Sequence, residues 1–208
     1  MGHYGAAFAA KAVWPEAPLP ALMLSTQIMD VAFCAFVGAG IEKIEITKQA
    51  NPTVPIRSNS IPYSHGFESA IIYSILCAVG ASLIYGDLTT QTLWVIGLIC
   101  LSHWFIDLIV HTGDLPILFG RRKVGFGLWN YRSAAIGLEF AVIILGIVAL
   151  ASAGVVTAWK VWVVGALMLG LQMHTNRAEP PASIVQLLAS MMTVFVLMTL
   201  LGVWLEAP

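Results

Sequence analysis

The sequence predicts an all-α integral membrane protein with about six transmembrane helices and a short N-terminal half-helix. Of its 208 residues, 59% are hydrophobic and only 10% are charged, whereas a soluble domain of this size carries about 25% charged residues. The mean hydropathy of +0.86 points to the same class. The net charge of -1 gives no electrostatic basis for binding nucleic acid.

Crossing the hydrocarbon core of a bilayer takes about 20 apolar residues. Five segments meet or approach that length, and a sixth is shorter. In chain order, the six segments are approximately 19–40, 65–86, 90–111, 133–154, 157–174 and 183–205. The short one, 157–174, is flanked by tryptophans and a lysine that suit an interfacial anchor. Before the first span, an apolar stretch starting at His3 stops at a proline-rich run, which predicts a half-helix.

The loops differ in length and charge. The long connections 41–64 and 112–132 fall on the same side as the loop 175–182. That side carries eight basic residues against two on the other, so the positive-inside rule places the long loops in the cytoplasm and both termini opposite, in an inner or plasma membrane. We interpret Arg121, Arg122 and Lys123 mainly as topology determinants, although they could bind lipid headgroups.

Several ionisable residues fall inside or beside the predicted spans, where each costs about 2.5–3.5 kcal/mol. His103, Asp107 and His111 recur at intervals of four residues, which places them on one face of a helix. Imidazoles and carboxylates are the ligands that zinc and similar divalent ions take. The pattern therefore favours a metal site, and the alternative is a polar crevice in which the histidines bond to the backbone.

Counting about 1.5 Å of rise per residue brings further side chains to the same region. His3 and Asp30 reach the level of His103 about halfway across the membrane, while His65 and Glu139 approach from the long-loop side. The predicted ligands are His3, Asp30, His65, His103, Asp107, His111 and Glu139. Seven ligands are enough for two ions, and we expect between one and three.

Three other polar residues are weaker candidates. Glu68 follows His65 by one turn, and a role in supporting a ligand or an interface is favoured over direct binding. Asp114 is at least as well explained as a turn residue. His174 is best explained by an interfacial role.

Several short elements of the sequence carry a family resemblance. They are Gly2-His3-Tyr4, Tyr63-Ser64-His65, Ser102-His103 through Asp107 and His111, Asp114-Leu115-Pro116, and Gly125 through Asn130. They resemble the predicted membrane-bound metal-dependent hydrolases, a group distantly similar to zinc-dependent phospholipase C. That enzyme is all-helical and holds its metals with His and Asp, including a His-x-x-x-Asp helix motif.

The resemblance covers roughly residues 1–140. It implies one transmembrane domain, 1–208, with its metal-site core in 1–140 and additional membrane helices in 141–208. It supports His65, His103 and Asp107 best as ligands, then Asp30, and likens His3 to the near-terminal ligand of the soluble enzymes. One departure is Ala135, four residues before Glu139, where the soluble enzymes carry a histidine.

The leading hypothesis is a metal-dependent hydrolase acting on a phosphoester, or a related ester, of a lipid-like substrate. Zinc would activate water, with Asp107 or Asp30 as ligand or base. The sequence has no nucleophile elbow and no phosphate-binding glycine loop of standard form. Two alternatives stay open. One is a transporter that uses the same cluster for protons or cations, and the other is a non-catalytic membrane subunit with a structural metal.

Overall fold

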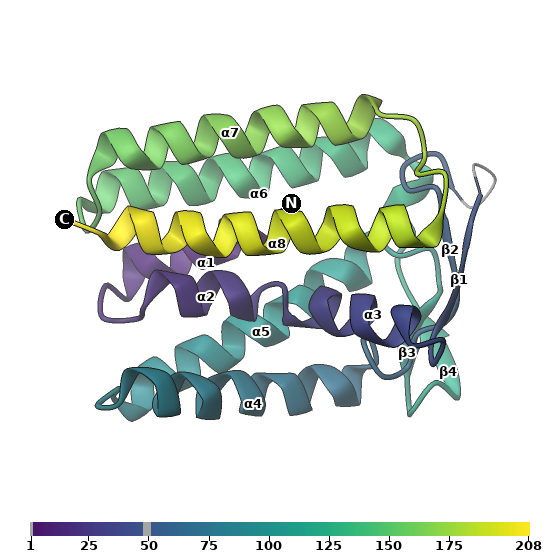
Figure 1. Cartoon of the computed structure of the whole chain (residues 1–208), viewed down its shortest axis with the longest axis horizontal. Coiled ribbons are helices and arrows are strands. Elements are labelled where there is room, and N and C mark those ends of the chain that lie inside the picture. The colour runs from purple at the N-terminus through teal and green to yellow at the C-terminus, as the bar shows by residue number, and fades with distance from the viewer. Residues whose placement is uncertain (1, 48–50) are drawn as a thin grey trace.

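The computed structural model describes residues 2–47 and 51–208. This part of the chain forms eight α-helices, two short β-hairpins and one 3-10 turn, η1 (Figure 1). The helices are α1 (His3–Val13), α2 (Leu19–Ser25), α3 (Ile28–Gly38), α4 (Phe67–Tyr85), α5 (Thr90–Val110), α6 (Arg132–Ala153), α7 (Ala158–Arg177) and α8 (Ile184–Glu206). The strands are β1 (Lys43–Ile46), β2 (Ile56–Ser60), β3 (Leu115–Ile117) and β4 (Arg122–Val124), and η1 is Leu128–Asn130.

The predicted helical class is confirmed. Within the described residues, α4, α5, α6 and α8 are long and apolar enough to cross a membrane, and the bent pair α2 and α3 makes a fifth candidate. These helices fit a membrane-embedded protein. The predicted count of six is not confirmed, because α7, although 20 residues long, is less apolar than the helices that qualify. It lies beside α6 (Figure 1) but carries polar residues that include Lys160 and Gln172.

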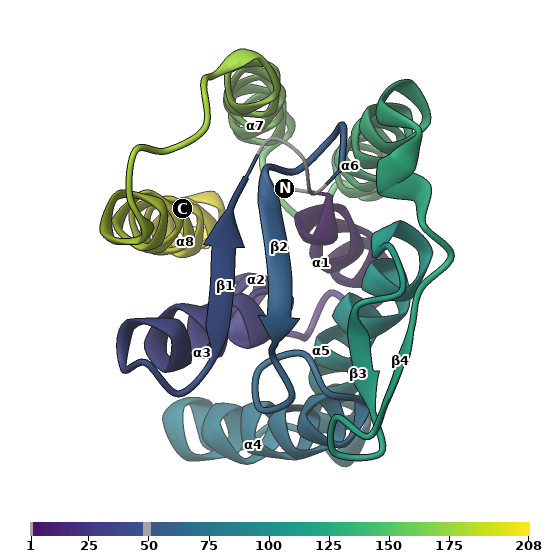
Figure 2. The same cartoon turned by 90° about the vertical axis from the view of Figure 1, so that its right-hand side faces the viewer.

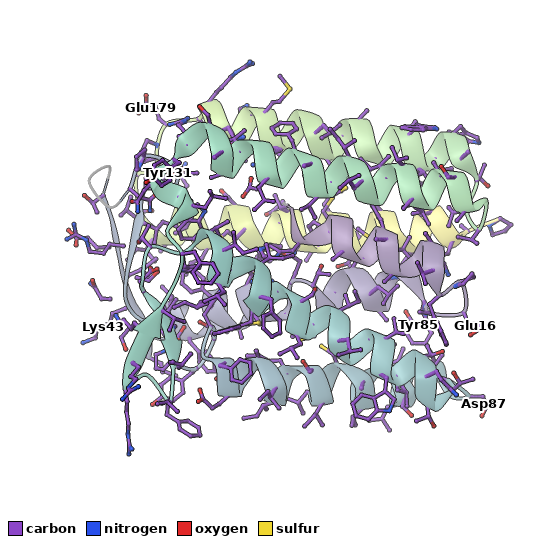
Figure 3. All side chains as sticks on the ribbon, turned by 180° about the vertical axis from the view of Figure 1, so that it is seen from behind. Glu16, Lys43, Tyr85, Asp87, Tyr131 and Glu179 are labelled. Atoms are coloured by element: carbon purple, nitrogen blue, oxygen red, sulfur yellow. The ribbon has the colours of Figure 1, made fainter. Side chains whose placement is uncertain are left out.

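The two ends of the helix bundle differ. Glu16, Tyr85 and Asp87 lie together at one end, which we call the turn end (Figure 3). At the other, which we call the hairpin end, β1 pairs with β2 and β3 pairs with β4, both antiparallel, and the two hairpins cross the bundle (Figure 2). The chain ends at the turn end, whereas its first described residues lie midway along the bundle (Figure 1). The long loops therefore contain short strands that the sequence did not reveal.

The first predicted span is not one continuous helix. It bends by 48° between α2 and α3. At the bend, the Ser25 and Thr26 hydroxyls donate to the carbonyls of Ala21 and Met23, at 2.7 and 2.8 Å. Such side-chain bonds compete with the regular helix ladder. The consequence is a helix start at Ile28, in the middle of the bundle, that a continuous span would not have.

The half-helix α1 runs from the middle of the bundle to the turn end, where its last turn is anchored. The buried Lys11 ammonium donates to the carbonyls of Pro15, at 2.8 Å, and Ala17, at 3.0 Å. It also pairs with the Glu206 carboxylate at the end of α8. The Leu19 amide donates to the same carboxylate at 2.9 Å. These bonds fix how far α1 reaches into the bundle.

Along its length, α1 packs against α6 through two glycines. A Cβ on Gly5 would lie 2.1 Å from the Val142 carbonyl oxygen, and one on Gly146 would lie 2.3 Å from the Gly5 carbonyl oxygen. Neither position has room for a side chain, so the two backbones are in direct contact. This contact sets the position of His3 at the start of α1.

Replacing Gly146 by Ala should therefore destabilise the protein by about 1–3 kcal/mol, the usual cost of overpacking. Gly137→Ala, on the same helix, is the matched control, because a Cβ there meets nothing within 4 Å. Since Ala is a better helix former than Gly, the control should be neutral or stabilising by up to about 1 kcal/mol. Thermal unfolding in detergent measures both. Equal shifts for the two variants would contradict the close approach of α1 and α6.

Candidate metal centre

Four histidines surround one buried carboxylate, that of Asp107 in α5. Its Oδ1 lies 3.4 Å from His3 Nε2. Its Oδ2 lies 3.1 Å from His103 Nε2, 3.7 Å from His65 Nε2 and 3.8 Å from His111 Nε2. The i, i+4 spacing predicted from the sequence thus brings His103 and Asp107 together, although His111 caps α5 rather than continuing it.

Asp30, from the first turn of α3, supplies a second carboxylate. Its Oδ1 lies 3.4 Å from His65 Nε2 and 4.0 Å from His103 Nε2. The His3 ring stacks on the His103 ring with 3.9 Å between centroids. The His103 side chain is 1% exposed, against 15% for His3 and 20% for Asp30. The cluster is therefore closed around His103 and more open beside Asp30 and His3.

The His103 ring is held by the bend in the first span. Its Nδ1 lies 2.5 Å from the Thr26 carbonyl oxygen. A carbonyl can only accept a hydrogen bond, so Nδ1 carries the proton and donates. In the neutral ring, Nε2 then presents a lone pair to the carboxylates. Partners of this kind on the outer ring nitrogen are typical of histidines that bind metals.

His111 is held by Asp114. Its Nδ1 donates to Asp114 Oδ1 at 2.8 Å, and its ring packs on Trp129 with 4.3 Å between centroids. Partial burial by itself would raise the pKa of the Asp114 carboxyl. The hydrogen bond and the charge interaction with His111 outweigh burial and lower that pKa below its ordinary value. Asp114 is thus a negatively charged acceptor that keeps the His111 proton on Nδ1.

His65 is held by a relay from the loops. The Ser64 hydroxyl donates to Glu42 Oε2 at 2.5 Å, because a carboxylate can only accept. Because this bond uses the only proton of the Ser64 hydroxyl, the hydroxyl oxygen accepts from His65, and His65 Nδ1 donates to Ser64 Oγ at 2.8 Å. The other oxygen of the buried Glu42 accepts the amides of Tyr63 and Ser64, at 2.8 and 2.9 Å. His65 Nε2 is left unprotonated toward the cluster.

Three rings thus point unprotonated Nε2 atoms at carboxylates. Two lone pairs facing each other at 3.1 Å, as between His103 and Asp107, repel unless a cation or an added proton lies between them. Asp107 Oδ2 is buried without a hydrogen-bond partner among the described residues. With neutral histidines, Asp30 and Asp107 also leave two negative charges in a region of low dielectric. A divalent cation would remove the repulsion between the lone pairs and would compensate the two negative charges, so the donor set fits a metal ion.

Two overlapping sets of ligand atoms could hold such an ion. One is His3, His103 and Asp107, and the other is Asp30, His65 and His103, each with its atoms within 4.8 Å of one another. The single Nε2 lone pair of His103 can serve one ion at a time. The two oxygens of Asp107 face different histidines, which suits a carboxylate shared between neighbouring ions.

Glu139 belongs to neither of these sets. Its carboxylate accepts a hydrogen bond from the buried Gln172 of α7, and its backbone lies against Gly2. Glu68 lies in the first turn of α4, with one carboxylate oxygen buried and unpaired among the described residues. His174 is exposed near the end of α7. The other predicted ligands that occur in those sets are His3, Asp30, His65, His103 and Asp107. His111 is in neither set, but its Nε2 lies 3.8 Å from Asp107 Oδ2.

The groups that orient the rings are hard to predict from the sequence. The Thr26 carbonyl is available only because the first span bends there. Glu42 is a loop carboxylate that pairs with Ser64 across 22 residues, so no local pattern reveals it. In the sequence, Ser64 stands out only as part of the Tyr63-Ser64-His65 element, and a turn explains Asp114 at least as well as a role at the site does.

No protein-family model matches this chain, and no curated protein or solved structure shows significant similarity to it.

Asp107→Asn should abolish binding of divalent metal while leaving the helical fold intact. The neutral amide has nearly the shape of the carboxylate but supplies one acceptor oxygen instead of two, and no charge. Elemental mass spectrometry of the purified protein measures metal per chain, and circular dichroism follows the helices. His174→Ala, an exposed histidine of α7, is the control and should keep its metal. Unchanged metal content in Asp107→Asn would rule out the site described here.

Ser64→Ala should weaken metal binding by about tenfold or more, because residues that orient metal-bound histidines typically contribute that much. Ser69→Ala is the matched control, since its hydroxyl donates to the Pro62 carbonyl at 3.0 Å and contacts no ring of the cluster. Competition with a chelating dye gives both affinities. Equal affinities in the two variants would show that the Glu42 relay does not orient His65.

Proposed function

We propose that the protein is a membrane-embedded, metal-dependent hydrolase that acts on a phosphoester, or a related ester, of a lipid-like substrate. One observation carries the proposal. Histidine Nε2 atoms from α1, α5, the C-cap of α5 and the segment just before α4 converge on the Asp30 and Asp107 carboxylates, with three rings oriented by hydrogen bonds at Nδ1. This arrangement resembles the His and Asp ligand sets of metallohydrolases.

Zinc, or a similar divalent ion, would lower the pKa of bound water and neutralise charge on the phosphoryl oxygens. His65, His103 and His111 would bind the ion through their Nε2 atoms, whose directions are fixed by the hydrogen bonds at Nδ1. Asp107 contacts the surrounding histidines with both of its oxygens. Asp30 is the more exposed carboxylate, so it is the better placed of the two to accept a proton from attacking water.

Two helix N-termini support an anionic substrate. Both α1 and α3 begin in the middle of the bundle, and from there α1 runs toward the turn end and α3 toward the hairpin end (Figure 1). A helix N-terminus carries unpaired backbone N–H groups and a partial positive charge, which favour a phosphate or carboxylate group nearby. The ligands His3 and Asp30 stand in the first turns of these two helices. A phosphoryl group bound at the cluster would therefore lie close to both.

A lipid-like substrate fits the surroundings of the site. The outward faces of α4, α6 and α8 are apolar, with Ile75, Leu145 and Leu200 each at least 59% exposed. We further propose that α7 completes six spans and that the hairpin end is cytoplasmic, as the distribution of basic residues predicts. The C-terminus would then lie on the opposite side. A substrate whose headgroup sits in the cytoplasmic leaflet could reach the cluster from that side.

The alternative of a transporter needs a polar path to the turn end. Between the cluster and that end, the described residues form an apolar core that includes Phe8, Leu22, Met23, Ile96 and Leu150, all fully buried. An ion would have to cross this mainly apolar region, at a cost of several kcal/mol. The packing therefore favours chemistry at a site reached from one side.

The hydrolase hypothesis predicts release of phosphorylated or dephosphorylated products from phospholipids or isoprenoid phosphates by the metal-loaded protein in mixed micelles. Asp30→Asn should lower kcat/KM by about 100-fold or more, the usual contribution of a general base, and Asp107→Asn should remove activity together with metal. His174→Ala should leave both unchanged. Product formation is followed by mass spectrometry, and chelation followed by zinc should abolish and then restore it.

Two results would contradict the proposal. Metal-dependent cation or proton flux in proteoliposomes, without hydrolysis of any of these substrates, would indicate a transporter. Tightly bound metal with four protein ligands and no exchangeable water, measured by X-ray absorption, would indicate a structural site in a membrane subunit.

A further inference from the structure

The β3–β4 hairpin carries an unusual turn at its tip. The turn residues Leu118 and Phe119 have φ values of +51° and +53°, and the Gly120 amide closes the turn on the Ile117 carbonyl at 3.1 Å. Two successive positive φ values are common for Gly and Asn but costly for bulky side chains. The turn thus presents two large apolar residues where small polar ones would form it with less strain.

These apolar side chains face outward. Phe119 is 79% exposed and Leu118 is 49% exposed. A Cβ on Gly120 would lie 3.2 Å from Pro62 Cβ, shortly before α4 begins. The hairpin reaches down toward α4 across the hairpin end of the bundle (Figure 2). The tip therefore lies at the rim of the bundle, level with the start of a membrane-length helix.

Three consecutive cations follow the turn. Arg121, Arg122 and Lys123 are exposed, and the hairpin Leu115–Val124 contains no acidic residue. Within the described part of the chain, no ion pair engages either arginine, while the Lys123 ammonium donates to the Asn59 carbonyl at 3.0 Å. On the β1–β2 hairpin at the same end, by contrast, Arg57 pairs with Glu45 at 3.6 Å.

We propose that the β3–β4 hairpin is an anchor for anionic lipid. Leu118 and Phe119 insert into the interfacial layer of the leaflet beside α4, and Arg121 and Arg122 bind phosphate groups of anionic headgroups above it. Apolar side chains at headgroup depth with basic residues next to them are the pattern of an interfacial anchor. This role is independent of the chemistry at the metal centre.

Insertion is tested with a spin label on Phe119→Cys in nanodiscs that contain anionic phosphatidylglycerol. The matched control is Glu45→Cys, exposed on the other hairpin at the same end, and the unsubstituted protein gives the background of the three native cysteines. The Phe119 label should be accessible to oxygen and shielded from a water-soluble nickel chelate, and the Glu45 label should show the reverse. Equal nickel accessibility at the two positions would overturn the proposal. A Phe119 label shielded from both reagents would also overturn it, by indicating a protein partner or a second copy of the chain.

Headgroup binding is tested with spin-labelled lipids. The unsubstituted protein should bind phosphatidylglycerol at least about twofold more tightly than phosphatidylcholine. The double variant Arg121→Gln, Arg122→Gln should lose most of that preference, whereas Arg57→Gln, a cation of the other hairpin, should keep it. A preference that survives the double variant, or one lost equally in Arg57→Gln, would overturn the role of these arginines.

Discussion

The negative charge of Asp107, buried within the helix bundle, is the constraint on which most of this structure depends. A carboxylate in a low-dielectric region needs a compensating charge. The four imidazoles that surround it, from α1, α5, the C-cap of α5 and the segment before α4, supply lone pairs and no charge when neutral, so a bound cation would supply the charge. Three of those rings are fixed at their outer nitrogens by a backbone carbonyl, a serine and an aspartate. The orientation of the rings, and not only their proximity, makes the cluster suitable for a metal ion.

Interrupted helices make this arrangement possible. The bend between α2 and α3 frees the Thr26 carbonyl for His103 and starts α3 two residues before Asp30. The half-helix α1 supplies His3 at the same depth, because the Lys11 contacts at one end and the Gly5 contact with α6 fix its position. Irregular backbone inside a membrane is tolerated where the protein buries it and satisfies its polar groups. Here the interruptions bring His3, Asp30 and His103 to one level of the bundle.

The two ends of the molecule are chemically unlike. Toward the turn end, a mainly apolar core lies between the cluster and the surface. Toward the hairpin end lie the relay through Glu42, the Asp114 support and the basic β3–β4 hairpin. This asymmetry suits a site that meets its substrate from one side of a membrane. It also places the proposed lipid anchor at the same end of the bundle as the groups that orient His65 and His111.

By itself, the sequence determined the helical class, the apolar character and approximate bounds of the helices, and most of the residues that meet in the buried cluster. Composition, the length of apolar runs and the recurrence of His103, Asp107 and His111 every four residues are local properties, so they can be read along the chain. Only the tertiary structure decided the bend at Thr26, the relay from Glu42 to His65 and the position of Glu139 beside Gln172 instead of within the ligand sets. Each of these depends on contacts between segments far apart in the chain, and no local pattern specifies which partners will meet.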